Sequence, residues 1–214
     1  FLKSGFISVD IFAASPVESQ PDQVSMLRRA GEGPQLMFTF AVGEEAEQAG
    51  QAFLREVGKL AAPIDQAGAR FRPGSTVRVD VVVWTRAIGH FFPGGTVDAF
   101  DVWLELEGKD AAGRTVFWSG RVEEGGKGPV EKGAHFYRSY LLDGEGNHVN
   151  KRNAWQARSL LYVRLIPPGA ADVAHYRVMI PKDAKGPITL TAKLNYRKFS
   201  HYYTQYVYLS LIHI

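Results

Sequence analysis

The strongest pattern in the chain is an alternation of apolar and other residues between positions 71 and 110. Every second residue from position 77 to position 83 is a valine, and a similar alternation returns over residues 101–107. A period of two with many β-branched residues predicts strands that place one face on a core. The predicted inward residues are Val77, Val79, Val81, Val83, Val102, Leu104 and Leu106, whereas Trp103, Glu105 and Glu107 are expected to face outward.

A short turn-forming segment separates these two strands. Pro93 is followed by two glycines. Proline has no backbone N–H to give to a sheet, and glycine supplies the backbone freedom that a tight bend requires. We therefore expect a rigid corner that carries His90, Phe91 and Phe92.

The rest of the chain consists mostly of short strand patterns divided by turns. Strands are predicted near residues 1–14, 35–42, 114–122, 134–142, 159–166, 174–180, 187–199 and 202–208. Residues 44–61 change to a period of three to four, with Glu44, Glu45 and Glu47 in the first turn, which predicts an amphipathic helix. This order of elements favours a mainly β protein, an antiparallel β-sandwich with one amphipathic helix.

Composition narrows the class of protein without selecting a function. The 214 residues are 45% hydrophobic and 22% charged, as in ordinary globular proteins. A net charge of +3 is too small to predict a nucleic-acid partner, and no run is apolar enough to predict a transmembrane segment. The absence of cysteine excludes disulfides, thiolate metal sites and covalent haem attachment within this chain.

The two ends suggest an internal fragment of a longer open reading frame. The chain begins at Phe1, and residues 209–214 read like a translated sequencing adaptor, so we leave them out of functional reasoning. We expect residues 1–70 to hold N-terminal strands, a loop and the helix, continuous with a missing upstream region. Residues 71–208 are expected to form the β-sandwich domain.

His90 is the first candidate for chemistry, because a rigid corner with apolar neighbours suits an imidazole that ligates a metal or a haem iron. The alternative is a turn histidine that hydrogen-bonds the backbone. The other histidines form no His-x-His or His-x-x-x-His pair, so no local metal motif exists. A site assembled across strands stays open, but a structural or solvated role is the simpler interpretation for His135, His148, His175 and His201.

Other candidate groups are weaker. Carboxylates near the corner and on the second strand could bind calcium or transfer protons, but solvated and capping roles are the simpler interpretation of Asp98, Asp101, Glu105 and Glu107. Ser119 lacks the context of a hydrolase nucleophile. The tyrosines of residues 196–208 could stack on sugars or on a partner, or pack as an ordinary strand.

Several phrases, taken in order, resemble one known family. They are residues 89–96 (GHFFPGGT), 101–105 (DVWLE), 134–138 (AHFYR), Asn153, residues 162–164 (YVR), 168–169 (PG), 174–177 (AHYR) and 196–199 (YRKF). This set is similar to the β-rich C-terminal portion of bacterial multihaem c-type cytochromes, which are often described with tetratricopeptide repeats. The resemblance covers roughly residues 71–208, and its most specific part is the phrase around His90.

The resemblance implies a periplasmic or extracellular protein that supports electron transfer by haem c attached upstream. This chain departs from a full family member because it has no Cys-x-x-Cys-His motif. The implied role is an accessory β-sandwich domain, with the upstream haem domain and redox proteins as partners. His90, and also His135 or His175, could then be a distal ligand to an upstream haem, with His90 as the first choice for iron.

Two other functions remain as alternatives. One is a stand-alone carbohydrate-binding or adhesion module, which requires an exposed aromatic row including Trp103 and Tyr206. The other is a metal-dependent enzyme in which His90, His135 and His175 converge on one ion. Whether the chain is an enzyme is left open, although we expect this fragment not to be catalytic by itself.

Overall fold

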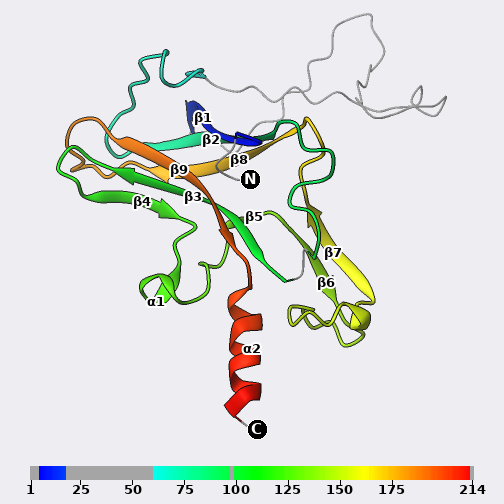
Figure 1. Cartoon of the computed structure of the whole chain (residues 1–214). Helices are drawn as coiled ribbons and strands as arrows, with labels where there is room; N and C mark the ends of the chain where they lie inside the picture. The colour runs from blue at the N-terminus through cyan, green and yellow to red at the C-terminus, as the bar shows by residue number, and fades with distance from the viewer. Residues whose placement is uncertain (1–4, 18–59, 97–98, 213–214) are drawn as a thin grey trace, which may run out of the picture.

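The computed structural model describes residues 5–17, 60–96 and 99–212, and it confirms a mainly β architecture of antiparallel sheets. One sheet has the strand order β1 (Ile7–Pro16), β2 (Thr76–Thr85) and β8 (Ala171–Met179). The second is built around β3 (Asp101–Lys109), which pairs along one edge with β9 (Thr189–Arg197) and along the other with β4 (Thr115–Ser119) and β5 (His135–Phe136). Figure 1 shows the two sheets lying face to face.

The predicted valine face is the centre of the core. Val81 and Val83 are fully buried, as are Leu104 and Leu106 on the facing sheet. Apolar residues of β8 and β9 complete the same cluster. Burying each such side chain contributes roughly 1.5–3 kcal/mol to the stability of the fold. The alternation therefore explains why the two sheets pack against each other.

Trp103 was predicted to face solvent, and that prediction is wrong. Only 5% of the residue is exposed, because a second apolar cluster of Val130, Ala134 and Phe136 covers this face of β3. The indole Nε1 donates a hydrogen bond to the Gly120 carbonyl at 2.9 Å. Gly120 itself has φ of +81°, and a Cβ there would lie 2.5 Å from the Leu104 carbonyl oxygen, so the close approach requires glycine.

A separate antiparallel ribbon extends beside the sandwich. Its strands are β6 (Arg138–Leu142) and β7 (Ser159–Arg164), so the strand predicted over residues 134–142 is divided into β5 and β6. The loop between β6 and β7 contains a short 3-10 turn at Ala154–Gln156. In Figure 1 this ribbon lies to one side of the two packed sheets.

The C-terminal element differs in type from the prediction. Residues 202–208 were expected to be a strand, but they belong to helix α2 (His201–Ile212), which projects away from the sandwich in Figure 1 and has no buried residue. Ser200 begins it as an N-cap, since its Oγ accepts a hydrogen bond from the Tyr203 backbone N–H at 3.3 Å. The other helical segment, α1 (Glu123–Gly126), is a single irregular turn.

The helix predicted over residues 44–61 and the strand predicted over residues 35–42 lie outside the described residues, apart from the last two positions of the helix range. The division of the chain at residue 70 stays a prediction. In the described ranges, no helix has both the length and the apolar character needed to cross a bilayer.

Candidate functional site

The corner that carries His90 is held by backbone pairing to the segment between β7 and β8. Phe92 exchanges two backbone hydrogen bonds with Ile166, at 2.8 and 2.7 Å. The Phe92 ring is buried and lies 6.3 Å from the Tyr137 ring, centroid to centroid. Phe92 therefore anchors the segment, while Phe91, which is 53% exposed, faces outward with His90.

His90 is exposed, and one of its ring nitrogens is already engaged. Nδ1 lies 2.7 Å from the Phe91 carbonyl oxygen. A carbonyl can only accept, so Nδ1 carries the proton and donates, which leaves Nε2 of the neutral ring with a free lone pair. A Cβ at Gly94 would lie 2.7 Å from Nδ1, so the glycine after the proline makes room for this ring position.

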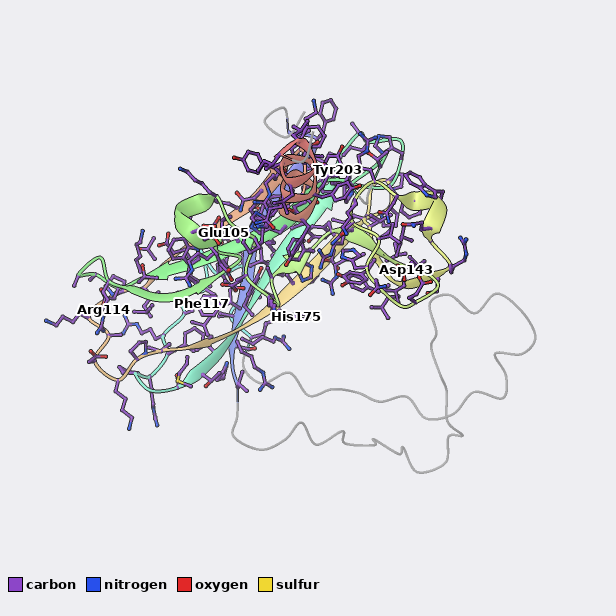
Figure 2. The ribbon with its side chains drawn as sticks, turned by 90° about the horizontal axis from the view of Figure 1, so that it is seen from below. Glu105, Arg114, Phe117, Asp143, His175 and Tyr203 are labelled. Carbon is purple, nitrogen blue, oxygen red and sulfur yellow. The ribbon has the colours of Figure 1, made fainter. Side chains whose placement is uncertain are left out.

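His175 lies on the outer face of β8, where Figure 2 labels it. It is the register partner of Asp80 on β2, and its Nδ1 donates to Asp80 Oδ1 at 2.7 Å. Arg78 also contacts Asp80, at 3.0 Å. A carboxylate behind an imidazole fixes the ring's tautomer and orientation, so Nε2 of His175 is the nitrogen available to a ligand.

His135 lies between the two sheets. Its Nε2 donates to Asp172 Oδ2 at 2.7 Å, and its ring meets the edge of the Tyr137 ring at 5.2 Å. The hydrogen bond from His135 lowers the pKa of the Asp172 carboxyl. Burial, together with the nearby Asp172 charge, raises the pKa of the Tyr137 hydroxyl above its usual range. The cluster keeps Asp172 ionised and Tyr137 neutral.

The three predicted histidines do not form one site. His175 and Asp172 occupy opposite faces of β8, because they are three residues apart on a strand, so the two His–Asp pairs point in different directions. Within the described part of the chain, no three His, Asp or Glu side chains gather closely enough to hold a metal ion. The convergent metal site considered from the sequence therefore has no counterpart among these residues.

His148, for which a structural or solvated role was expected, packs against other aromatic rings. Its ring stacks on Tyr140 with centroids 3.8 Å apart and planes 8° from parallel. Tyr140 also stacks with Tyr162, at a centroid distance of 5.5 Å. Burial, and then the positive charge of Arg138, lowers the pKa of His148 to about 4. The stack forms across the turn of residues 143–147, where the Asp143 N–H donates to the Asn147 carbonyl at 2.9 Å.

The aromatic row required of a carbohydrate-binding module is not assembled as predicted. Trp103 is buried, and Tyr206, which is 49% exposed, lies on α2 and not on a strand. Trp155, at 75% exposed, is on the loop of the β6–β7 ribbon. The exposed aromatic residues are thus spread over separate elements.

Comparison with known proteins yields two structural likenesses. No protein-family model matches the sequence, and no curated protein matches it either. The chain is similar to a penta-heme cytochrome c552 from Thermochromatium tepidum, with a TM-score of 0.46 and 14% identity over 61% of this chain and 31% of that one. It is also similar to a family 123 glycoside hydrolase from Clostridium perfringens, with a TM-score of 0.24 and 14% identity over 58% and 20%.

The present chain thus spans about a third or less of either solved protein. Neither overlap is close enough to show a common fold. Neither adds an argument about function.

Proposed function

We propose that this chain is an accessory β-sandwich domain of an extracytoplasmic multihaem c-type cytochrome, and that His90 is a distal axial ligand to a haem attached upstream. The haem would supply one-electron transfer, and the domain would contribute a ligand and cover the cofactor from water. The ordered phrases that resemble this family, centred on residues 89–96, motivate the proposal.

The observation that carries the proposal is the geometry of His90. The ring is exposed, its Nδ1 proton is held by the Phe91 carbonyl, and Nε2 is free. A ligating histidine commonly donates its second ring N–H to a backbone carbonyl or carboxylate, which orients the ring and raises its basicity. Phe91 beside it would give an iron site an apolar border.

The Nε2 of His175 is also free, and Asp80 orients its ring through Nδ1. His175 is therefore the second choice for a ligand. His135 is the third, because its Nε2 is occupied by Asp172 and only Nδ1 remains, on a ring set between the sheets. His90 comes first because the phrase around it is the most specific part of the resemblance, and access to a ring nitrogen then places His175 before His135. The order can be tested variant by variant.

The direct test adds a small haem c peptide with one vacant axial position to this chain and follows the Soret band. The chain is expected to convert the haem to a low-spin form at neutral pH, and His90→Ala is expected to weaken this by about tenfold or more. His201→Ala, at the start of the exposed helix, is the matched control and should leave the titration unchanged. Equal binding by wild type and His90→Ala would rule out the ligand role.

A further inference from the structure

A cavity lies between the two sheets at the end of the sandwich away from α2. It has a volume of about 730 Å³, in the range of small-molecule sites. Its walls are aliphatic and come from both sheets and two loops, and include Val77, Val178, Ile180, Ile188 and Leu190. A space of this size between sheets is unusual in a close-packed core.

The rim of the cavity is tied to the strands. Ala61 exchanges two backbone hydrogen bonds with Ala14 of β1, and the Ile64 N–H donates to the Phe12 carbonyl at 2.9 Å. At the other end of this loop, the Gly74 N–H donates to the Ile180 carbonyl at 2.9 Å. The loop of residues 61–74 is therefore held at both ends, and it carries Ile64, Arg70 and Phe71 over the opening.

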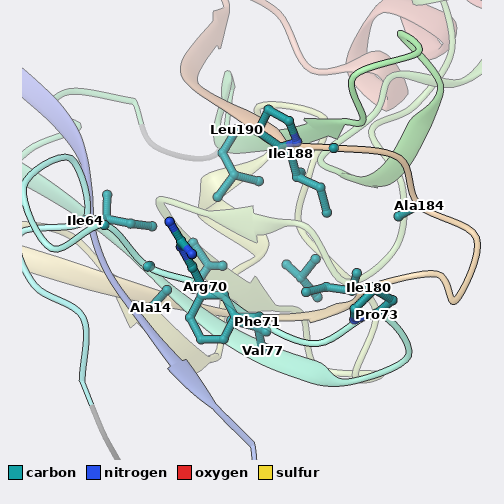
Figure 3. Close-up of a pocket in the computed structure, with 16 residues that line it drawn as sticks. Ala14, Ile64, Arg70, Phe71, Pro73, Val77, Ile180, Ala184, Ile188 and Leu190 are labelled. Carbon is teal, nitrogen blue, oxygen red and sulfur yellow. The ribbon is translucent and has the colours of Figure 1, made fainter.

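Arg70 is the charged residue among those that line the cavity. Arg70 is solvent-exposed, and Figure 3 shows its side chain at the opening of the cavity, beside Ile64. No carboxylate among the described residues contacts Arg70, and the other residues that line the cavity are apolar. A guanidinium at the mouth of an aliphatic cavity complements a carboxylate, which its planar fork binds through two parallel hydrogen bonds.

We infer that this cavity binds a single-chain fatty acid, with the carboxylate on Arg70 and the aliphatic tail between the sheets. The walls consist mainly of Val, Ile, Leu, Ala and Pro side chains, which present no polar group to fix a headgroup inside. Burial of the aliphatic tail favours binding, and the guanidinium selects for the anionic head over a neutral one. This site is separate from His90 and does not depend on the haem proposal.

The test is calorimetric titration of the intact chain with dodecanoate, below its micelle concentration, compared with dodecanol. Dodecanoate is expected to bind and to raise the unfolding temperature, and dodecanol to bind at least about tenfold more weakly. Arg70→Gln should remove this preference for the carboxylate. Arg72→Gln, an exposed arginine two residues away that does not line the cavity, is the matched control and should bind like wild type.

A second variant tests the position of the tail. Ala184→Phe places a large ring at the rim and should weaken both ligands, whereas Arg70→Gln weakens only dodecanoate. Binding of dodecanoate that is unchanged in Arg70→Gln, or equal affinity for the alcohol, would overturn the assignment of the headgroup. Failure of the wild-type chain to bind dodecanoate, including failure because another segment of the chain fills the space, would overturn the site.

Discussion

At the scale of single residues, one ring nitrogen is engaged in a hydrogen bond in each of His90, His135 and His175. His90 donates to a backbone carbonyl, His175 donates to an aspartate on the neighbouring strand, and His135 donates to an aspartate of the other sheet. His148 has a different environment, since it stacks on Tyr140 beside the cationic Arg138. The partners of these histidines come from distant parts of the chain, so they could not be read from the spacing of histidines in the sequence.

His148 makes the stability of the fold depend on pH. Its pKa is about 4 in the folded chain against 6.5 for the free side chain, so the unfolded state binds more protons between these values. Stability should therefore be complete above pH 6.5 and fall as the pH decreases toward 4. We expect a loss of roughly 1–2 kcal/mol, which is less than the full shift implies because the ring is partly solvated.

Urea unfolding of wild type and His148→Gln at pH 7.5 and pH 4.5 measures this effect. The variant has no titrating ring, so the stability difference between the two proteins should change with pH in this window. Parallel pH curves for the two proteins would contradict the assignment to His148. Asp143 and Asp172, whose pKa values are lowered, lose their contributions only at more acidic pH.

At the scale of elements, the alternation of β2, β3 and β9 was sufficient to predict their inward faces. A strand was also predicted near residues 187–199, and the apolar residues of β9 pack against the core. The aromatic run after it was misread, because tyrosines favour strands and the capping signal of Ser200 was given no role. The chain leaves the sheet at Ser200, whose N–H donates to the Ala99 carbonyl at 2.9 Å.

The end of the β3–β9 pair depends on one ion pair. Asp101 and Arg197 are register partners, and the Arg197 Nε and Nη2 both donate to Asp101 Oδ2, at 3.1 and 2.7 Å. Asp101 is 7% exposed, and Arg197 also donates to the Gly128 carbonyl at 2.8 Å. Removing the carboxylate leaves a largely covered guanidinium without its counter-ion.

Asp101→Ala is therefore expected to lower the free energy of unfolding by about 2–3 kcal/mol. Asp183→Ala, which removes the exposed partner of Arg114, is the matched control and should have no measurable effect. Chemical unfolding of both variants tests this difference. Equal stability of the two variants would show that the buried pair contributes no more than a surface pair.

At the scale of the whole molecule, the two sheets meet through a common apolar core and, at one edge, through a polar contact. His135 of β5 and Asp172 of β8 belong to different sheets and lie 2.7 Å apart. The side chains are 18% and 32% exposed, so the hydrogen bond is only partly screened by water. This contact joins the two sheets at that edge.

Asp172→Asn should cost roughly 1–2 kcal/mol at pH 7. Because the pKa of Asp172 is lowered in the folded chain, its contribution is present above about pH 3.8 and is lost as the pH falls through the folded value. The difference from wild type should therefore shrink in strongly acidic buffer. Asp10→Asn, which alters a contact with Trp84 inside one sheet, is the control for urea unfolding and should be near neutral.

The sequence by itself determined the class of fold and the inward faces of β2 and β3, because a period of two is a local property and burial of one face follows from it. It also placed His90 on a proline-glycine corner. Only the tertiary structure decided which aspartate orients each histidine, that Trp103 is covered, and that a cavity opens beside Arg70. These features depend on residues far apart in the chain, which meet only when the two sheets pack and their loops are tied across the ends.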